Sequence, residues 1–419
     1  MKNIKQIGAV GGAVALLLCW PLAVGHIGHQ VINHGLAEID SNQISAEIIT
    51  YDRGYLSSNV TTQFSVTDTS LKQQLISEGL PTQWLVESHI KHQLFSLAAE
   101  SRLPEYPDLP ITMQSQTRLN GNTDYSVQMD NWHFQSEGEQ PFHLAVQPIT
   151  LNGSISRAGE LSYHLQLPSA RINFIDGQTL QISEFVAQGY GHQEHNFWLG
   201  QQALKLANLT LLDDEDGVVF SANQGNYVFV SSLDESKQRF TGQHNLVIAE
   251  LANEEGNIKQ LTFDFSLADL DSQAFEQLSE LYHDYADSPF DTLNRALPVM
   301  ERLFAQGFSL NLNQLSAVVG EGEFNAKWLL SVPMGTDNIL QDPTSILPAL
   351  TGEVDNYISQ QFAEDFPFIQ MTMDELVMME MATQDESGYY IKANLKQGDV
   401  LFSNGTQVAL LSLLMPLFM

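Results

Sequence analysis

The chain has 419 residues, of which 18 are Lys or Arg and 50 are Asp or Glu, so its formal net charge is −32. Hydrophobic residues make up 43% of the chain and charged residues 16%, a composition too apolar for a disordered acidic protein. The negative charge repels phosphate groups, which argues against nucleic acid as a partner and against broad docking on anionic lipid headgroups. The single cysteine, Cys19, excludes an intramolecular disulfide and any cysteine-based zinc or iron–sulfur site.

The first 25 residues form a candidate membrane-targeting segment. Residues 7–24 are apolar and uncharged, and Lys2 and Lys5 precede them. This length is close to the roughly 20 residues that cross the hydrocarbon core of a bilayer. Two interpretations remain open, a cleaved signal peptide and an uncleaved signal anchor, and Trp20 and Pro21 within the run favour the anchor. Because the lysines precede the run, the positive-inside rule predicts a bacterial inner-membrane protein with a single span and its body in the periplasm.

Beyond residue 40, alternating apolar and polar residues predict strand after strand. Residues 261–267, for example, place apolar side chains at every second position. Such alternation gives one wet face and one dry face, which is typical of an antiparallel sheet open to water on one side. Turn signals such as Asn152-Gly153 and Asp176-Gly177 separate the runs.

Three stretches show helical spacing of apolar residues instead, at residues 70–100, 267–305 and 346–362. Asp271 is a candidate N-cap in the second stretch, and Pro289 predicts its division into two helices. The expected fold class is therefore α+β and predominantly antiparallel β. We expect one or more long curved sheets with two or three packed helices, preceded by an N-terminal anchor helix.

The expected domain organisation follows from where long helices first appear. The division lies near residue 267, where the chain changes from nearly all strand to a mixture of helices and strands. The predicted parts are a signal anchor or signal peptide at residues 1–25, a β-rich domain at residues 40–266 and an α+β domain at residues 267–419. The last part either stands alone or continues the same sheet.

A short segment soon after the apolar run carries a family resemblance. Its residues are Tyr51, Arg53, Gly54, Ser57 and Ser58, in the order Tyr-x-Arg-Gly-x-x-Ser-Ser. The segment resembles the YdgA-like bacterial family of unknown function, the domain of unknown function 945. Scattered segments over most of the chain are also similar, including residues 296–300, 320–324 and 389–405. A His-Gly-Pro-Phe segment frequent in that family is missing, and residues 88–92 stand in its place.

The resemblance implies an envelope location and a membrane tether, and it transfers no catalytic residue. The segment also has a structural interpretation drawn from its residues. Gly54 can adopt a positive φ or a bulge that turns one strand into the next. Arg53 can pair with a carboxylate of this acidic chain. On this interpretation the motif is structural.

Motifs for catalysis and nucleotide binding are missing from the sequence. It contains neither a Gly-x-Ser-x-Gly elbow nor a Walker loop. Residues 213–217 are acidic but lack the spacing of a calcium-binding loop, which predicts a solvated hairpin tip. A weak metal-site hypothesis rests on His192, Glu194 and His195. In an extended chain the two imidazole rings point to opposite faces, and only a turned chain brings all three together.

The functional prediction is a membrane-anchored periplasmic protein without enzymatic activity or cofactor, serving as an envelope scaffold or partner-binding module. One alternative is the binding or transfer of lipids or other amphiphiles along an apolar sheet face. A weaker alternative is a metal-dependent enzyme. The predicted partners are the inner membrane, through the anchor, and envelope proteins or lipids. A scaffold predicts covered apolar faces, whereas an amphiphile-binding protein predicts an apolar face open to solvent.

Overall fold

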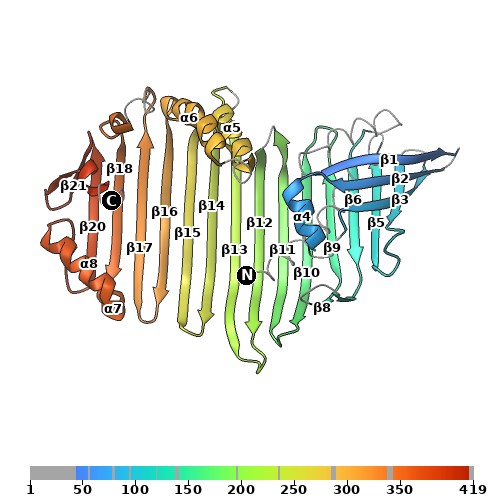
Figure 1. Ribbon diagram of the computed structural model, residues 1–419, viewed down its shortest axis with the longest axis horizontal. Helices are drawn as coiled ribbons and strands as arrows, with labels where there is room; N and C mark the ends of the chain where they lie inside the picture. Colours follow the sequence, from blue (N-terminus) through green and yellow to red (C-terminus); the bar gives the residue numbers. More distant parts are fainter. Residues whose placement is uncertain are drawn as a thin grey trace. The chain divides into compact units, whose positions relative to one another are not determined.

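A computed structural model describes residues 44–414, apart from 55–56, 78–80, 94–95, 119, 137–140, 195–196, 235, 285–288 and 337–342. This part of the chain is mostly antiparallel sheet with a few helices, which confirms the predicted fold class (Figure 1). It contains six α helices rather than two or three. The predicted anchor at residues 1–25 lies outside the described residues. Within them, no helix is both long and apolar enough to cross a bilayer.

The chain divides into two compact units. Unit 1 covers Met1–Gly191 and Leu206–Val219, and unit 2 covers His192–Lys205 and Phe220–Met419. The predicted domain boundaries at residues 25, 40 and 267 stay a prediction. Three strands have residues in both units: β11 (Thr179–Glu194), β12 (Phe197–Leu212) and β13 (Val218–Asp234).

Unit 1 is built from antiparallel neighbours that follow one another almost in chain order. The strands pair as β1–β2–β3–β4–β5–β6–β9–β10–β11, and β8 joins β10 to β7. The helix of this unit is α4 (Thr69–Ser77). The strands not yet given are β1 (Ile44–Arg53), β2 (Ser57–Val66), β3 (Gln83–His92), β4 (Ser96–Arg102), β5 (Ile111–Arg118), β6 (Thr123–Met129), β7 (Trp132–Gln135), β8 (Phe142–Val146), β9 (Ile149–Ile155) and β10 (Leu161–Phe174).

Unit 2 is also an antiparallel meander, paired as β13–β14–β15–β16–β17–β18–β20–β21–β22, with β19 beside β20. Its strands are β14 (Arg239–Asn253), β15 (Gly256–Asp271), β16 (Phe308–Val319), β17 (Gly322–Val332), β18 (Thr351–Ser359), β19 (Thr383–Gln384), β20 (Gly388–Lys396), β21 (Asp399–Phe402) and β22 (Gln407–Ala409). Its helices are α5 (Ser272–Asp284), α6 (Pro289–Gln306), the 3-10 helix η1 (Pro343–Ile346), α7 (Gln360–Asp365), α8 (Pro367–Met378) and α9 (Leu410–Leu414).

Two of the three predicted helical stretches are largely wrong. Of residues 70–100 only the start is helical, and Trp84, Val86 and Ile90 are buried at every second or fourth position of β3. Residues 351–359 form β18 between β17 and β20, although Val354 and Ile358 also fit a helical spacing. In both cases pairing with neighbouring strands prevails over a local pattern that fits either structure.

The hairpin turn predicted at Asn152-Gly153 is also wrong, because both residues lie inside β9. Gly153 pairs directly with Tyr125 of β6. A Cβ at position 153 would overlap the Tyr125 hydroxyl group and the Ser162 carbonyl oxygen. Only glycine at position 153 leaves room for the close approach of the Tyr125 ring. Aromatic side chains on a neighbouring strand often cover a strand glycine in this way. By contrast, Gly177 does lie at a turn, with φ +88°.

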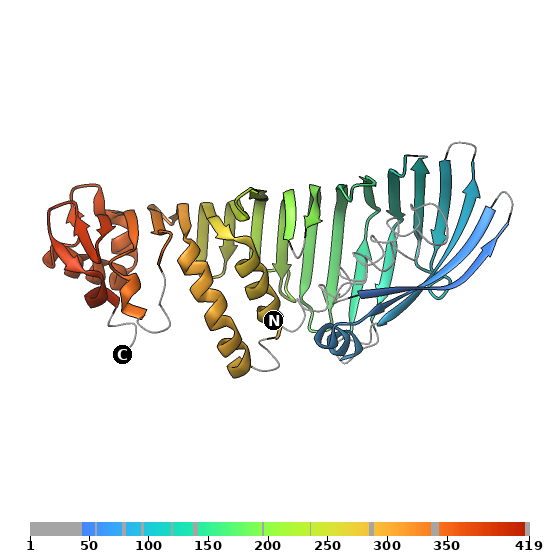
Figure 2. The ribbon, with the colours of Figure 1, turned by 90° about the horizontal axis from the view of Figure 1, so that it is seen from above.

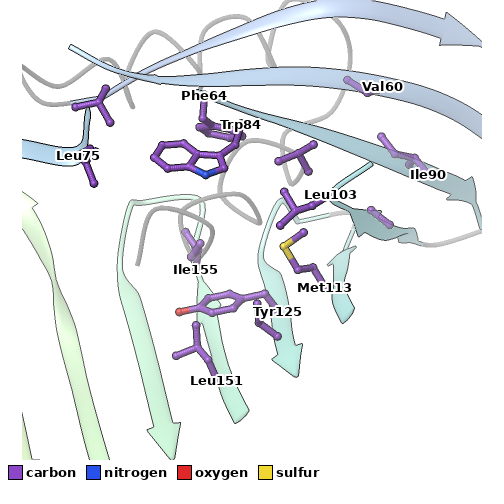
Figure 3. Close-up of a cluster of buried hydrophobic side chains, with 14 residues drawn as sticks. Val60, Phe64, Leu75, Trp84, Ile90, Leu103, Met113, Tyr125, Leu151 and Ile155 are labelled. Atoms are coloured by element: carbon purple, nitrogen blue, oxygen red, sulfur yellow. The ribbon is translucent and has the colours of Figure 1, made fainter. Parts of the chain in front are cut away.

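The interior of unit 1 contains a cluster of buried apolar side chains (Figure 3). Phe64 and Trp84 of β2 and β3 are in this cluster with Tyr125 and Ile155 of β6 and β9. Leu75 of α4 joins them. The dry face of the unit 1 sheet is thus covered by its own strands and helix, and burial of such side chains stabilises each by about 1.5–3 kcal/mol.

The helical stretch at residues 267–305 is confirmed, and α6 begins at Pro289 as predicted. Both α5 and α6 lie on the same side of the unit 2 strands (Figure 2). They cover Phe240 and Leu270 there, and Phe240 stacks on Phe275 of α5 with ring centroids 5.3 Å apart. Asp271 is the N-terminal cap: its Oδ1 accepts a hydrogen bond from the Ala274 amide at 2.9 Å.

We expect Asp271→Ala to lower the free energy of unfolding by about 2 kcal/mol, the upper range for loss of an N-cap. The reason is that the buried carboxylate also pairs with Arg302 of α6 at 3.1 Å, so the change leaves two groups without their partner. Urea denaturation measures the effect. Glu254→Ala, an exposed acid in the turn between β14 and β15, is the control. Equal denaturation midpoints for the two variants would contradict the capping role.

Candidate functional site

The segment that carries the family resemblance forms a hairpin of unit 1. Strand β1 ends at Arg53 and β2 begins at Ser57, with Arg53 opposite Ser58 in register. The Gly54 amide donates a hydrogen bond to the Ser57 carbonyl oxygen at 2.8 Å, and a Cβ on Gly54 would lie 2.7 Å from the same oxygen. Its φ is not in the left-handed region, so close approach rather than a positive φ favours glycine.

The first and last residues of this segment, Tyr51 and Ser58, contribute to the interior of unit 1. Ser58 is buried, and Tyr51 packs against the unit 1 cluster from its place opposite Val60. The segment therefore contributes to the hairpin and the core of unit 1. That the role of the motif is structural stays a prediction.

The weak metal candidates are brought together only in part. His192 and Glu194 are two apart in β11, so their side chains point to the same face, and Nε2 of His192 lies 3.5 Å from Oε2 of Glu194. His195 lies outside the described residues. Within the described residues, no three His, Cys, Asp or Glu side chains are placed to share a metal ion.

A polar groove of about 620 Å³ crosses β3, β4, β5, β6 and β9 of unit 1. Its lining includes His89, Lys91, Glu100, Gln114 and Asn152, which stand on the wet face of the strands. His89 is hydrogen-bonded through Nδ1 to the Asn59 side chain at 2.8 Å. Charges of both signs and amides alternate here, as on an ordinary solvated sheet face.

The dry face of the unit 2 sheet is different, because large apolar side chains line up across neighbouring strands. One register row runs Phe229, His244, Phe265, Leu312, Trp328 from β13 to β17. A second row runs beside it through Tyr227, Leu246, Phe263, Leu315 and Ala326. A bulge at residues 313–314 lets both Leu312 and Leu315 point to this face. We call these ten residues the open apolar face.

The open apolar face is only partly covered within the described residues. Its side chains belong to none of the buried clusters, and Trp328 is 51% exposed. Helices α5 and α6 pack on the same side but on Leu267 and Leu270, towards the other end of β15. Eight of its ten residues are large and apolar, His244 and Ala326 being the others, and all but Trp328 are partly buried. Apolar side chains in two adjoining rows form a larger patch than scattered surface residues produce, and such patches mark binding sites.

The opposite face of the same strands is more polar. The Asn245 side chain donates to Asp264 at 3.2 Å, and Asn311 donates to the Ser266 hydroxyl at 3.3 Å. This face also carries exposed aliphatic side chains, Val230, Val247 and Leu329, and Leu329 is 46% exposed and placed between Asn311 and Glu353 in register. The open apolar face is therefore the more apolar of the two sides of these strands, and it carries their aromatic side chains.

His244 is the titratable side chain at the centre of the open apolar face. Its ring lies 4.7 Å from the Phe229 ring and 6.5 Å from the Phe265 ring, centroid to centroid. The Tyr227 hydroxyl is 2.7 Å from Nδ1 of His244. Burial among these rings lowers the pKa of His244 below its ordinary value and raises the pKa of Tyr227. His244 is therefore a neutral, partly polar side chain at neutral pH.

The lowered pKa of His244 predicts a pH-dependent stability. The folded protein binds a proton at His244 less readily than the unfolded chain does. The contribution of His244 to the free energy of unfolding is therefore present above the unfolded pKa of about 6.5, and it is lost as the pH falls through the folded pKa. We expect the urea concentration at the denaturation midpoint to decrease when the pH is lowered from 7.5 to 5.5. The His244→Phe variant should show a smaller decrease. His133→Phe, at an exposed histidine of β7, is the control. An unchanged pH profile in the His244 variant would contradict the argument.

The alternation of apolar residues at 261–267 and near Tyr227 predicts dry strand faces. The sequence pattern did not reveal that β13 to β17 stand in register, nor that the covering helices lie at one end. Helix α8 was also missed, although Met371, Met373, Met378 and Met379 cluster in this short region of the sequence.

Comparison with known proteins gives a family but no characterised relative. The family model described as a bacterial protein of unknown function, DUF945, matches residues 1–410. It covers nearly the whole chain and confirms the predicted domain of unknown function 945, while the YdgA-like name stays a prediction. Neither a curated protein nor a solved structure matches the chain.

Proposed function

The chain belongs to this bacterial family of unknown function, and we propose that it is a non-enzymatic binding protein of the cell envelope. Its proposed ligand is an amphiphile whose acyl chain lies on the open apolar face of unit 2. The observation that carries the proposal is the row from Phe229 to Trp328, apolar apart from a neutral histidine and partly open to solvent. An open face favours amphiphile binding over a scaffold, which requires covered faces.

The dimensions of the face suit an acyl chain. Strands are about 4.8 Å apart, so the four steps from β13 to β17 extend the row over about 19 Å. One layer of acyl chains in a bilayer is about 15 Å thick, half of a hydrocarbon core of about 30 Å. Each CH₂ group removed from water contributes about 0.8 kcal/mol. A row of this length can therefore hold one extended chain, with the headgroup beyond its edge.

The chemistry also restricts the headgroup. A chain with a net charge of −32 repels anionic headgroups, so a neutral or zwitterionic amphiphile is the better match. Polar groups stand at both ends of the second row: the Tyr227 hydroxyl on β13, and Asn356 of β18 opposite Ala326. Asn356 accepts a hydrogen bond from the Trp328 indole nitrogen at 2.8 Å. We further propose that residues 1–25 tether the protein to the inner membrane, with the sheet on the periplasmic side.

The test is lipid extraction from protein folded in its native membrane. A protease site inserted between residues 34 and 43 releases the body after folding, and mass spectrometry identifies co-purifying lipids. We expect a zwitterionic lipid in near-stoichiometric amount, and its loss from a variant with Phe265→Asp on the open face. Recovery of no lipid above that from an unrelated periplasmic protein would contradict the proposal.

A further inference from the structure

We propose that the outer face of α8 is a docking surface for a basic amphipathic helix of a partner protein. This helix is apolar on both sides. Met373, Ile369 and Leu376 face inward and pack with Tyr389 and Ile391 of β20. The opposite side carries Phe368, 75% exposed, and Met378, 76% exposed. Large apolar side chains on the outer side of a helix, beside those on its inner side, indicate a surface that a partner covers.

The exposed side chains follow helical spacing and form one stripe. Phe368, Met371 and Met378 are three and seven positions apart, and Met371 and Met379 are also exposed. Residues spaced in this way lie on one side of a helix. Methionine is flexible and polarizable, and it is common at surfaces that accept apolar side chains of a partner helix. This stripe, with Phe366 at its start, is the α8 stripe.

Acidic residues lie within and around the α8 stripe. Glu375 is exposed between Met371 and Met378, and Glu364, Asp365, Asp374 and Glu380 are near it in the chain, which has no Lys, Arg or His from residue 328 to residue 391. Four of these five acids accept side-chain hydrogen bonds. Asp374 accepts from the Tyr389 hydroxyl at 2.9 Å and Glu380 from the Thr406 hydroxyl at 3.1 Å, and Glu364 and Asp365 accept from Gln360 and Gln361. The acidic residues are therefore part of the folded surface.

An apolar stripe of this kind suits either a membrane surface or an apolar helix face of a partner protein, and the acidic residues around it favour the second. An anionic membrane surface is repelled by five carboxylates, whereas lysines or arginines flanking an apolar helix face are attracted by them. A helix that lies along an apolar stripe contacts it through side chains at positions i, i+3, i+4 and i+7. The α8 stripe therefore fits an amphipathic helix with basic flanks.

The probe for this surface is a fluorescent 14-residue amphipathic peptide of Leu and Lys, with a Leu and Glu peptide of the same pattern as its comparison. The full-length chain is reconstituted in phosphatidylcholine nanodiscs, and empty nanodiscs serve as the blank. We expect the Leu/Lys peptide to bind, with an affinity that falls as salt rises from 0.05 to 0.5 M, and the Leu/Glu peptide not to bind.

Neutral substitutions separate the stripe from the general charge of the protein. We expect Phe368→Ser with Met378→Ser to weaken Leu/Lys peptide binding at least tenfold. Ile175→Ser, at a residue 74% exposed in unit 1, is the matched control and should change it less than twofold. Glu375→Gln should weaken binding about two- to threefold. Equal effects of the stripe and control variants, or binding of both peptides alike, would overturn the proposal. So would stripe-dependent flotation with phosphatidylglycerol vesicles without peptide binding.

Discussion

Trp328→Lys is expected to weaken the binding of a fluorescent lysophosphatidylcholine at least tenfold. The indole occupies the β17 end of the row and is half exposed, so its removal takes apolar area from the ligand rather than from the core. Tenfold corresponds to about 1.4 kcal/mol, which is the transfer free energy of about two CH₂ groups. The zwitterionic probe keeps its charge between pH 5 and 8, so the protein alone determines any pH dependence.

The matched control is Leu329→Lys. This neighbour on β17 is exposed to nearly the same extent and gains the same charge, but it points to the polar face. We expect an unchanged affinity for the probe. If both variants lose affinity equally, the ligand is not on the open apolar face. If neither does, Trp328 has no part in binding.

Gly153→Val is expected to lower the free energy of unfolding by about 3 kcal/mol, the upper range for overpacking of a core. The new Cβ would overlap the Ser162 carbonyl oxygen and the Tyr125 ring, and a strand hydrogen-bonded on both sides cannot move away easily. The Tyr125 hydroxyl also donates to that carbonyl oxygen at 3.1 Å. Urea denaturation of the full chain measures the change.

Asn152→Val separates this clash from the general effect of valine in a strand. Asn152 precedes Gly153 in β9 and is exposed on the other face, so we expect a change within about 0.5 kcal/mol. In the background of Tyr125→Ala, Gly153→Val should cost less than in the unmodified chain but still more than nothing, because the clash with the Tyr125 ring is gone and the clash with the Ser162 carbonyl remains. A loss of less than 1 kcal/mol in Gly153→Val would contradict the close approach.

The sequence predicts the strands well where alternation is strict and pairing leaves one face dry. It predicts α5 and α6 because Asp271 and Pro289 mark the helix starts. It does not predict β3 or β18, since Trp84 to Ile90 and Val354 to Ile358 fit both periods and only the neighbouring strands decide between them. Asn152-Gly153 has the composition of a turn, but the Tyr125 ring opposite determines its place in a strand.

The candidate sites were less predictable than the fold. A binding face made of two residues from each of five strands has no local motif, because its members Phe229 and Trp328 lie 99 positions apart in the chain. Its position depends on register, and register depends on hairpin lengths and bulges such as the one at residues 313–314. His192 and Glu194 were predicted from local spacing alone, and Nε2 of His192 lies 3.5 Å from Oε2 of Glu194 on one strand.

Photo-crosslinking of the full-length chain in its native membrane tests the account most directly. A lysophosphatidylcholine with a diazirine on its acyl chain is activated by light, and the labelled peptides are identified by mass spectrometry. The account predicts labels on peptides of unit 2 that contain Phe229, Phe265 and Trp328, reduced by Trp328→Lys and not by Leu329→Lys. Labels absent from β13 to β17, or equally frequent on the polar face of those strands, would contradict it.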